Sequence, residues 1–170
     1  VSAQPRTWMY ERVLIPTDGS PSAEAAARHG SLIAEAFEAS VHILSVVGEQ
    51  ARGDRLAKAQ AQDAISTLED LFAQESDLSC QSVIERGRPH EAIRSYAAET
   101  DIDLVVMGTH GRRGLSRALL GSVTERIIRL SNDPVLAVPP HAMGRERDGY
   151  ERSSSRRTAV LLLLQQSTTG

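Results

Sequence analysis

The segment "IDLVVMGTHGRRGLSRALLGS", residues 102–122, gives the strongest indication of the fold. Its apolar residues are consecutive from Leu104 to Met107, and the run ends at Gly108. A continuous apolar run of this length is typical of a strand that is covered on both faces, as in parallel sheets. A helical pattern begins near Ser122 and extends to about Leu130. A buried strand that is followed by a helix predicts one unit of an α/β fold.

The same alternation of strand and helix continues on both sides of this segment. Short aliphatic and β-branched runs predict the other strands, and apolar residues at three- and four-residue spacing predict the other helices. The expected strands are 12–17, 40–47, 78–87, 102–108 and 134–139, and the expected helices are 23–37, 54–74, 88–100 and 122–130. This order predicts a five-stranded parallel sheet with helices on both faces and right-handed crossovers.

Two loops of the expected sheet lie where a ligand can bind. Open α/β sheets bind ligands beyond the carboxyl ends of their strands, at the point where the strand order reverses. The loop "PTDGS", residues 16–20, follows the first strand, and "MGTHG", residues 107–111, follows the fourth. If these two strands are neighbours, both loops border one crevice.

Length and composition limit the class of protein. The 170 residues suffice for one domain with its own core. Aromatic residues make up only 4% of the chain, so we expect an aliphatic core. Gly30 lies within an expected helix, and its lack of a side chain is expected to allow that helix to pack closely on the sheet. A net charge of -3 and a pI near 6.0 lack the basic balance of duplex-binding proteins, so we expect no nucleic-acid partner.

The single cysteine and the apolar runs bear on the compartment. Cys80 has no partner for an internal disulfide, and we expect it to be a small buried side chain and not a reactive thiol. The longest apolar run, Ala159–Leu164, is too short to span a bilayer, and no secretory signal is visible. We therefore expect a cytoplasmic protein with no membrane partner.

The two ends of the chain differ from its middle. We expect an N-terminal extension at residues 1–8, one domain at 9–140 and a polar tail at 141–170. Residues 141–158 contain five arginines and few apolar side chains, which is typical of a mobile segment. The run "AVLLLLQQ", residues 159–166, predicts a short helix or strand that docks on the domain or on a partner, and a frayed end is the alternative.

The spacing of glycines after the fourth strand predicts an anion site. Gly108 ends the strand, Gly111 lies three residues later, and Gly121 and Ser122 open the next helix. Glycine lets backbone N–H groups approach a ligand, and a helix N-terminus adds unpaired N–H groups and a partial positive charge. Such a site needs no lysine, and the hydroxyls of Ser122 and Thr124 can add donors. The alternative is that Gly121 and Ser122 only cap the helix and that Gly108 only serves a turn.

This spacing, G-x2-G-x9-G-[S/T], resembles the motif of universal stress proteins that bind ATP. The segments "VLIPTDGSPSA" (13–23), "GRPHEAI" (87–93) and "DPVLAVP" (133–139) resemble the same family, and the likeness extends from Met9 to Pro139. It implies a single Rossmann-like, adenine nucleotide alpha-hydrolase-like three-layer sandwich. It also implies a homodimer through the last strand, Pro134–Pro139, which we expect at an unpaired sheet edge.

The resemblance further implies which residues bind the nucleotide: the nucleoside near the first and second strands, and the phosphates at the helix after the glycines. Asp18 is expected to accept hydrogen bonds from the ribose, although turn formation is its alternative role. His110 is expected to bind ligand or backbone and not to catalyse, and Arg112 to contact phosphate or face water. The implied residues are Pro16, Thr17, Asp18, Val46, Val47, Met107, Gly108, His110, Gly111, Arg112, Gly121, Ser122, Val123 and Thr124.

The leading hypothesis is a regulatory or stress-response protein that binds ATP, with or without Mg²⁺, as a structural ligand or signal. The sequence has no G-x4-GK[ST] loop, no G-x-S-x-G elbow and no acidic pair for a dedicated metal site. We therefore expect neither catalytic residues nor a metal site of the protein itself. Two alternatives stay open: a slow ATPase or autophosphorylating protein, and an interaction module with a vestigial pocket.

Overall fold

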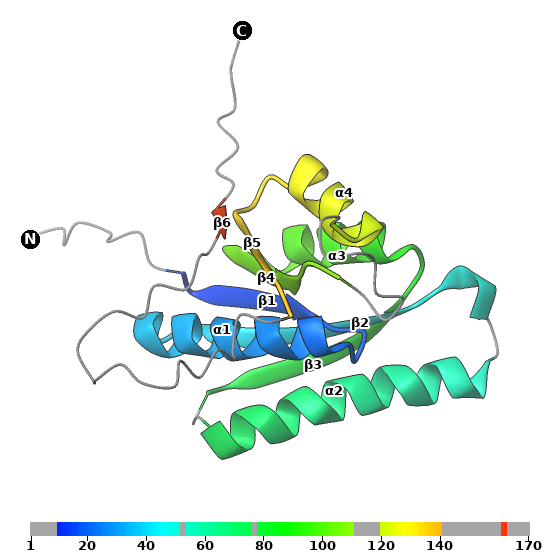
Figure 1. Cartoon of the computed structure of the whole chain (residues 1–170), viewed down its shortest axis with the longest axis horizontal. Coiled ribbons are helices and arrows are strands. Elements are labelled where there is room, and N and C mark those ends of the chain that lie inside the picture. Colours follow the sequence, from blue (N-terminus) through cyan, green and yellow to red (C-terminus); the bar gives the residue numbers. More distant parts are fainter. Residues whose placement is uncertain (1–9, 52–53, 76–77, 111–119, 141–160, 163–170) are drawn as a thin grey trace, which may run out of the picture.

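Five parallel strands, as the alternation in the sequence predicts, form most of a six-stranded sheet (Figure 1). The structure, a computed structural model, describes residues 10–51, 54–75, 78–110, 120–140 and 161–162. In chain order the elements are β1 (Arg12–Pro16), α1 (Pro21–Phe37), β2 (Ser40–Val47), the 3-10 helix η1 (Glu49–Ala51), α2 (Arg55–Glu75), β3 (Cys80–Arg86), α3 (Pro89–Glu99), β4 (Leu104–Gly108), α4 (Ser122–Leu130), β5 (Val135–Val138) and β6 (Leu161–Leu162).

The strand order reverses in the middle of the sheet. The order is β3-β2-β1-β4-β5-β6, so the chain first builds outward from β1 on one side and then continues from β4 on the other. β1 and β4 are hydrogen-bonded neighbours, with Val13 opposite Leu104 and Leu14 opposite Val105. The loops that follow β1 and β4 therefore lie at the same edge of the sheet, which confirms that they border one crevice.

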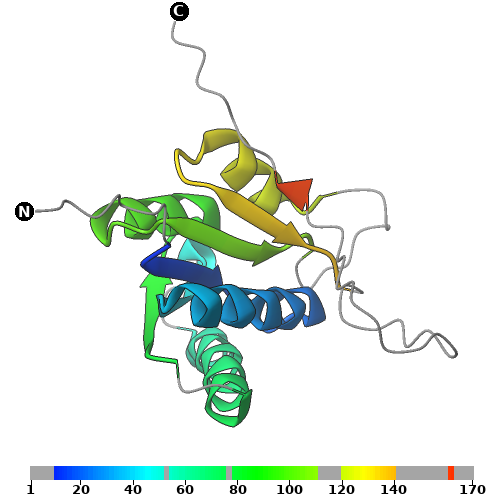
Figure 2. The same ribbon diagram turned by 90° about the vertical axis from the view of Figure 1, so that its left-hand side faces the viewer.

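Alternate residues of each strand serve two separate layers of core. In β1, Val13 and Ile15 pack in a cluster with residues of α1 and α2, whereas Leu14 packs in a cluster with residues of α3 and α4. Figure 2 shows these two pairs of helices on opposite sides of the sheet. Both clusters consist mainly of Ala, Val, Leu and Ile, as the scarcity of aromatic residues predicts.

Helix α1 begins with a side-chain cap and lies close against the sheet. The Ser20 side chain accepts a hydrogen bond from the Ala23 N–H at 3.2 Å, and Pro21 follows in the first turn, where its missing N–H costs no hydrogen bond. A Cβ at Gly30 would lie 2.6 Å from Cδ1 of Ile15. The predicted close approach of this helix at Gly30 is therefore confirmed.

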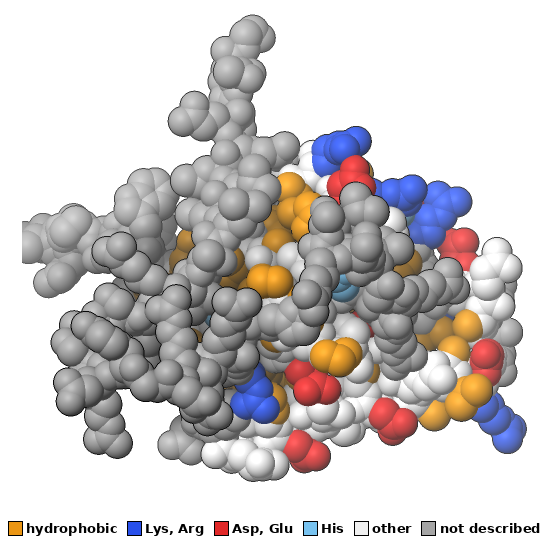
Figure 3. Space-filling model, in the orientation of Figure 1, with side chains coloured by type: hydrophobic (Ala, Val, Ile, Leu, Met, Phe, Trp, Pro, Cys, Tyr) orange, Lys and Arg blue, Asp and Glu red, His pale blue; other side chains and the backbone are white. Residues whose placement is uncertain are grey.

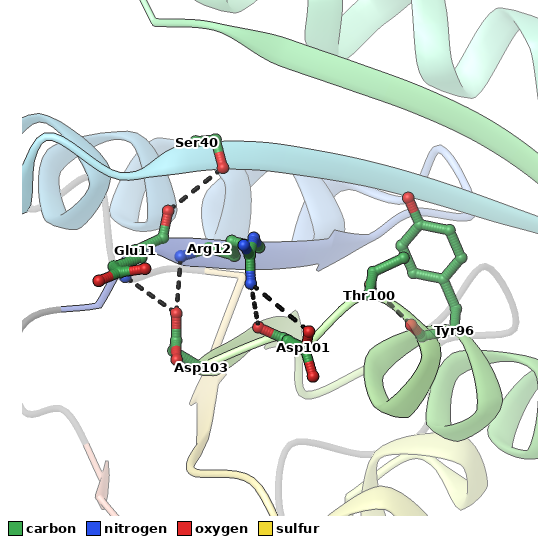
Figure 4. Close-up of polar contacts among 7 residues, drawn as sticks. All are labelled: Glu11, Arg12, Ser40, Tyr96, Thr100, Asp101 and Asp103. Atoms are coloured by element: carbon green, nitrogen blue, oxygen red, sulfur yellow. Dashed lines mark hydrogen bonds and ion pairs between the residues drawn. The ribbon is translucent and has the colours of Figure 1, made fainter.

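Polar groups at the amino end of the sheet bind one another (Figure 4). Oδ2 of Asp103 accepts hydrogen bonds from the backbone N–H groups of Glu11 and Arg12, at 2.9 and 2.8 Å. The Arg12 guanidinium donates to the carbonyl of Asp101 at 3.3 Å and lies 3.9 Å from its carboxylate. These contacts fix the start of β1 beside the start of β4.

The β5 strand does not lie at the sheet edge, contrary to the expectation for residues 134–139. Leu161 and Leu162 form β6, which pairs antiparallel with Ala137 and Leu136 of β5. The apolar run at 159–164 thus contributes a strand that docks on the domain, one of the outcomes that its sequence leaves open. Of the expected tail at 141–170, the described part is this strand alone.

Cys80 is half-buried, and not fully buried as expected. Burial, with a smaller contribution from Glu69, raises the pKa of the Cys80 thiol, which keeps it in the less reactive protonated form. In the part of the chain that the structure describes, no helix has the length and apolar character needed to cross a membrane.

Candidate functional site

A cavity of about 620 Å³ opens at the carboxyl end of the sheet, between the ends of β1 and β4. Its volume is in the range of small-molecule sites. Residues from β1, β2, β4, α1, α3 and α4 surround it. They are Pro16, Thr17, Asp18, Ser20, Ala23, Leu44, Val46, Pro89, Ile93, Met107, Gly108, His110, Gly121, Ser122, Val123 and Thr124.

Backbone and side-chain bonds shape the loop after β1. The Thr17 N–H continues the sheet by donating to the Leu44 carbonyl at 2.8 Å. Oδ1 of Asp18 accepts the Ser20 N–H at 3.0 Å, and the intervening Gly19 has a φ of 73°. Asp18 therefore performs the turn-forming role named above as its alternative, while it also lines the cavity.

The N-terminus of α4 is tied to the end of β4. The Gly121 N–H donates to the Thr109 carbonyl at 2.7 Å, and the Thr124 hydroxyl donates to the Gly108 carbonyl at 2.8 Å. Thr109 in turn donates its N–H to the Val138 carbonyl at 2.9 Å. These hydrogen bonds hold the first turn of α4 against the cavity. The Thr124 hydroxyl already donates its proton to the Gly108 carbonyl, so it has no second proton to donate to a ligand.

Three helices, α1, α3 and α4, begin beside the cavity, and they differ in their caps; α3, whose N-cap residue is Arg88, has no side-chain cap, and its first position is Pro89, which has no N–H to donate. Ser20 caps α1, whereas α4 has Gly121 as its N-cap residue, with no side-chain bond to the first turn. The N–H groups in the first turn of a helix have no acceptor within the helix, and they carry a partial positive charge. In α4 the residues of that turn, Ser122, Val123 and Thr124, all line the cavity. The arrangement can accept an anion through backbone groups alone.

Gly108 is required by packing as well as by the site. A Cβ built there would lie 2.5 Å from Oγ of Ser22 and 2.7 Å from its backbone carbonyl atoms. Ser22 was not singled out from the sequence, where it reads as an ordinary residue near a helix start. Its hydroxyl donates to the Val138 carbonyl and accepts the His110 N–H, both at 3.3 Å. It therefore joins α1, β5 and the loop after β4.

His110 is held by its neighbours on three sides. Its N–H binds Ser22, its carbonyl accepts the Ser20 hydroxyl at 3.3 Å, and its Nδ1 lies 2.8 Å from Oγ1 of Thr109. Its buried Nε2 has no hydrogen-bond partner among the described residues. The predicted backbone contact of His110 is thus present, and its predicted contact with a ligand stays a prediction.

Exposed basic side chains gather beside the cavity. In Figure 3 the Lys and Arg side chains concentrate at the upper right, over α4 and the adjacent α3. Arg126 of α4 is exposed, and its Nη1 lies 3.5 Å from Nε2 of His90, next to the lining residue Pro89. Arg129 is also exposed and forms a 2.8 Å ion pair with Glu125. Positive charge near the opening favours the approach of an anion.

The cavity brings most of the predicted site residues together. Eleven of them line it: Pro16, Thr17, Asp18, Val46, Met107, Gly108, His110, Gly121, Ser122, Val123 and Thr124. Val47 does not, because its side chain is buried in the sheet and its carbonyl accepts the Gly87 N–H at 3.0 Å. Gly111 and Arg112 lie outside the described residues.

Five lining residues were missed by the sequence reasoning: Ser20, Ala23, Leu44, Pro89 and Ile93. Leu44 lies two positions before Val46 on the same strand, so the period of two could have found it. Ser20 belongs to the quoted loop after β1. Pro89 and Ile93 come from α3, and no local signal places that helix over the site. Within the described ranges, no group of three His, Cys, Asp or Glu side chains could hold a metal ion.

The sequence of residues 9–139 matches the model of a family described as the universal stress protein family. The chain belongs to this family. It is similar to universal stress protein MJ0531 of Methanocaldococcus jannaschii, with 37% identity over 76% of this chain and 82% of the relative. Universal stress protein MJ0577 of the same organism is 30% identical over 76% of this chain and 95% of its own length.

Solved structures agree with this assignment of fold and family. A structure of the MJ0577 protein is similar with a TM-score of 0.66 and 32% identity, and it covers 77% of this universal stress protein and 96% of its own chain. A universal stress protein that was solved in complex with cAMP has a TM-score of 0.56 and 28% identity, covering 78% of this chain and 98% of its own.

Proposed function

We propose that this universal stress protein binds an adenine nucleotide, with ATP as the preferred ligand, in the cavity between β1 and β4. One observation carries the proposal. The N-terminus of α4 has no side-chain cap, and all three residues of its first turn line a cavity at the point where the strand order reverses. The family relative in complex with cAMP supports an adenine nucleotide as the class of ligand.

The two sides of the cavity suggest how the ligand lies. Leu44, Val46, Ile93 and Met107 form an apolar part that suits a purine base. Asp18, at the end of β1, is the proposed acceptor for ribose hydroxyls. The phosphates then reach the first turn of α4, where backbone N–H groups and the Ser122 hydroxyl can donate to them.

A magnesium ion would enter with the ATP and would not be held by the protein alone. Asp18 is the one carboxylate among the lining residues, and Mg²⁺ is commonly bound by one or two carboxylates together with substrate phosphates. We propose that phosphate oxygens supply most of its ligands and that the Ser122 hydroxyl is the nearest protein group. ATP should therefore bind in EDTA as well, with a lower affinity.

Isothermal titration of the full chain with ATP, ADP, AMP and cAMP tests the proposal. We expect the affinity to fall from ATP to AMP, because each lost phosphate removes hydrogen bonds at α4. No binding of any of the four by folded protein would contradict the proposal and would favour a vestigial pocket. Release of phosphate from bound ATP, measured in the same samples, tests the alternative of slow hydrolysis.

A further inference from the structure

Strand β5 is hydrogen-bonded on both sides, and its second partner comes from far along the chain. On one side it pairs parallel with β4 over four residue pairs, from Val105–Val135 to Gly108–Val138. On the other side it pairs antiparallel with β6 over two pairs, Leu136–Leu162 and Ala137–Leu161. Figure 2 shows β6 beside β5, at the outer side of the sheet. The segment that covers this edge is thus the distal tail of the same chain.

The cover is smaller than the strand that it covers. Within the described residues, β6 consists of two residues and pairs with the two middle residues of the four-residue β5. Residues 139–160 separate the two strands, and closing a loop of this length opposes the pairing through lost chain entropy. The two described ladder pairs provide few hydrogen bonds to offset that entropy loss, so the pairing of β6 with β5 is expected to be weak.

The edge beneath β6 suits a second copy of the same strand. β5 reads "VLAV", with no charged residue to discourage pairing, and Pro134, Pro139 and Pro140 limit the paired length at both ends. The edge already accepts a strand in the antiparallel direction. Two copies related by a two-fold axis perpendicular to the sheet would also present their β5 strands antiparallel to each other.

We propose that β6 is a displaceable cap on the edge of β5, and that it competes with a second copy of this chain for the same edge. The cap would set how readily the homodimer forms that the sequence leads us to expect through residues 134–139, and the inference rests on that expectation. Because both copies must open before they pair, a cap in place in about 70% of molecules weakens dimerisation about tenfold.

Sedimentation equilibrium of three variants beside the full chain tests the cap. The first ends at Pro140; the second is the full chain with Leu161→Pro and Leu162→Pro, which removes the N–H groups of β6. The third, with Gln165→Pro and Gln166→Pro, is the matched control because it alters the tail outside β6. We expect the first two to dimerise about tenfold more tightly than the full chain, and the control to behave like the full chain.

Hydrogen exchange of the β5 amides identifies the edge in the same samples. In the full chain the β5 amides that face β6 should be protected; in the truncated chain they should exchange faster at concentrations where it is monomeric and regain protection when it dimerises, while the amides that face β4 stay protected throughout. Equal dimerisation of the truncated and full chains would overturn the proposal. A full-chain dimer that truncation dissolves would overturn it too, because β6 would then pair between copies. Titration with ATP is read separately, since its failure bears on the nucleotide site and leaves the cap untouched.

Discussion

The two ends of the same sheet use polar groups in opposite ways. At the amino end, Asp103 and Arg12 pair with backbone groups and with Asp101, so the polar groups there bind one another. At the carboxyl end, the first turn of α4 lines a cavity without a side-chain cap. The comparison indicates that the polar groups of the amino end contribute to stability, whereas the first turn of α4 at the carboxyl end faces a cavity, as the proposed nucleotide site requires.

The largest expected effect on stability is at Gly108, which packs against Ser22 and also lines the cavity. A Gly108→Ala substitution places a Cβ against Ser22, whose backbone atoms would lie only 2.7 Å away. We expect a loss of about 3 kcal/mol in the free energy of unfolding, measured by urea denaturation, because backbone cannot move aside as a side chain can.

Gly48→Ala is the matched control for this change. A Cβ at Gly48 would meet no atom within 4 Å, so its effect on unfolding should be within about 0.5 kcal/mol. Equal losses at Gly48 and Gly108 would contradict the packing that places α1 against the end of β4.

The second effect separates the ends of the sheet directly. Asp103→Ala leaves two backbone N–H groups at the start of β1 without their carboxylate acceptor, and we expect unfolding to become easier by about 2 kcal/mol. ATP affinity, measured at a temperature where the variant is folded, should not change. Asp101→Asn is the control: the carboxylate of Asp101 is 87% exposed, asparagine tolerates its left-handed backbone at a φ of 50°, and loss of the surface pair should cost less than about 1 kcal/mol.

The smallest effect is a dependence of stability on pH. His42 of β2 is buried, and its Nδ1 lies 2.9 Å from the Tyr96 hydroxyl. Burial, and to a lesser extent the charge of Arg12, lowers the pKa of His42 below its ordinary value of 6.5. At a pH just below 6.5, His42 is protonated in the unfolded chain but still neutral in the folded chain. The contribution of His42 to the free energy of unfolding is therefore greatest above pH 6.5 and declines as the pH falls below it.

The contribution of His42 can be tested by measuring the free energy of unfolding of the wild type and of His42→Gln between pH 7.5 and 5. One histidine can contribute a slope of at most about 1.4 kcal/mol per pH unit, and the variant should lack that part of the slope. Identical slopes in the two proteins would show that other groups cause the dependence.

Local patterns predict the five parallel strands and the four α-helices to within two residues at each end, because apolar periodicity is a property of neighbouring residues, but they do not predict the 3-10 helix η1. They also place Asp18 and Gly121 at the same edge once β1 and β4 are neighbours. The pairing of Leu161 with Ala137 is a contact between distant segments, and so is the binding of Asp103, which falls within the expected strand 102–108, to the N–H groups of Glu11 and Arg12. Neither has a local signal, and the same holds for Ile93 of α3 at the cavity.

The most direct test compares Ser122→Pro with Ser122→Ala by titration with ATP. Proline is favoured at the first position of a helix, and Gly121, with a ψ of 147°, already has the extended backbone that a residue before proline adopts. The proline variant removes the N–H and the hydroxyl, whereas the alanine variant removes the hydroxyl alone. If the backbone of α4 binds the phosphates, Ser122→Pro should bind ATP about tenfold more weakly than Ser122→Ala, with an unchanged melting temperature without nucleotide. Equal affinities of the two variants for ATP would contradict the account.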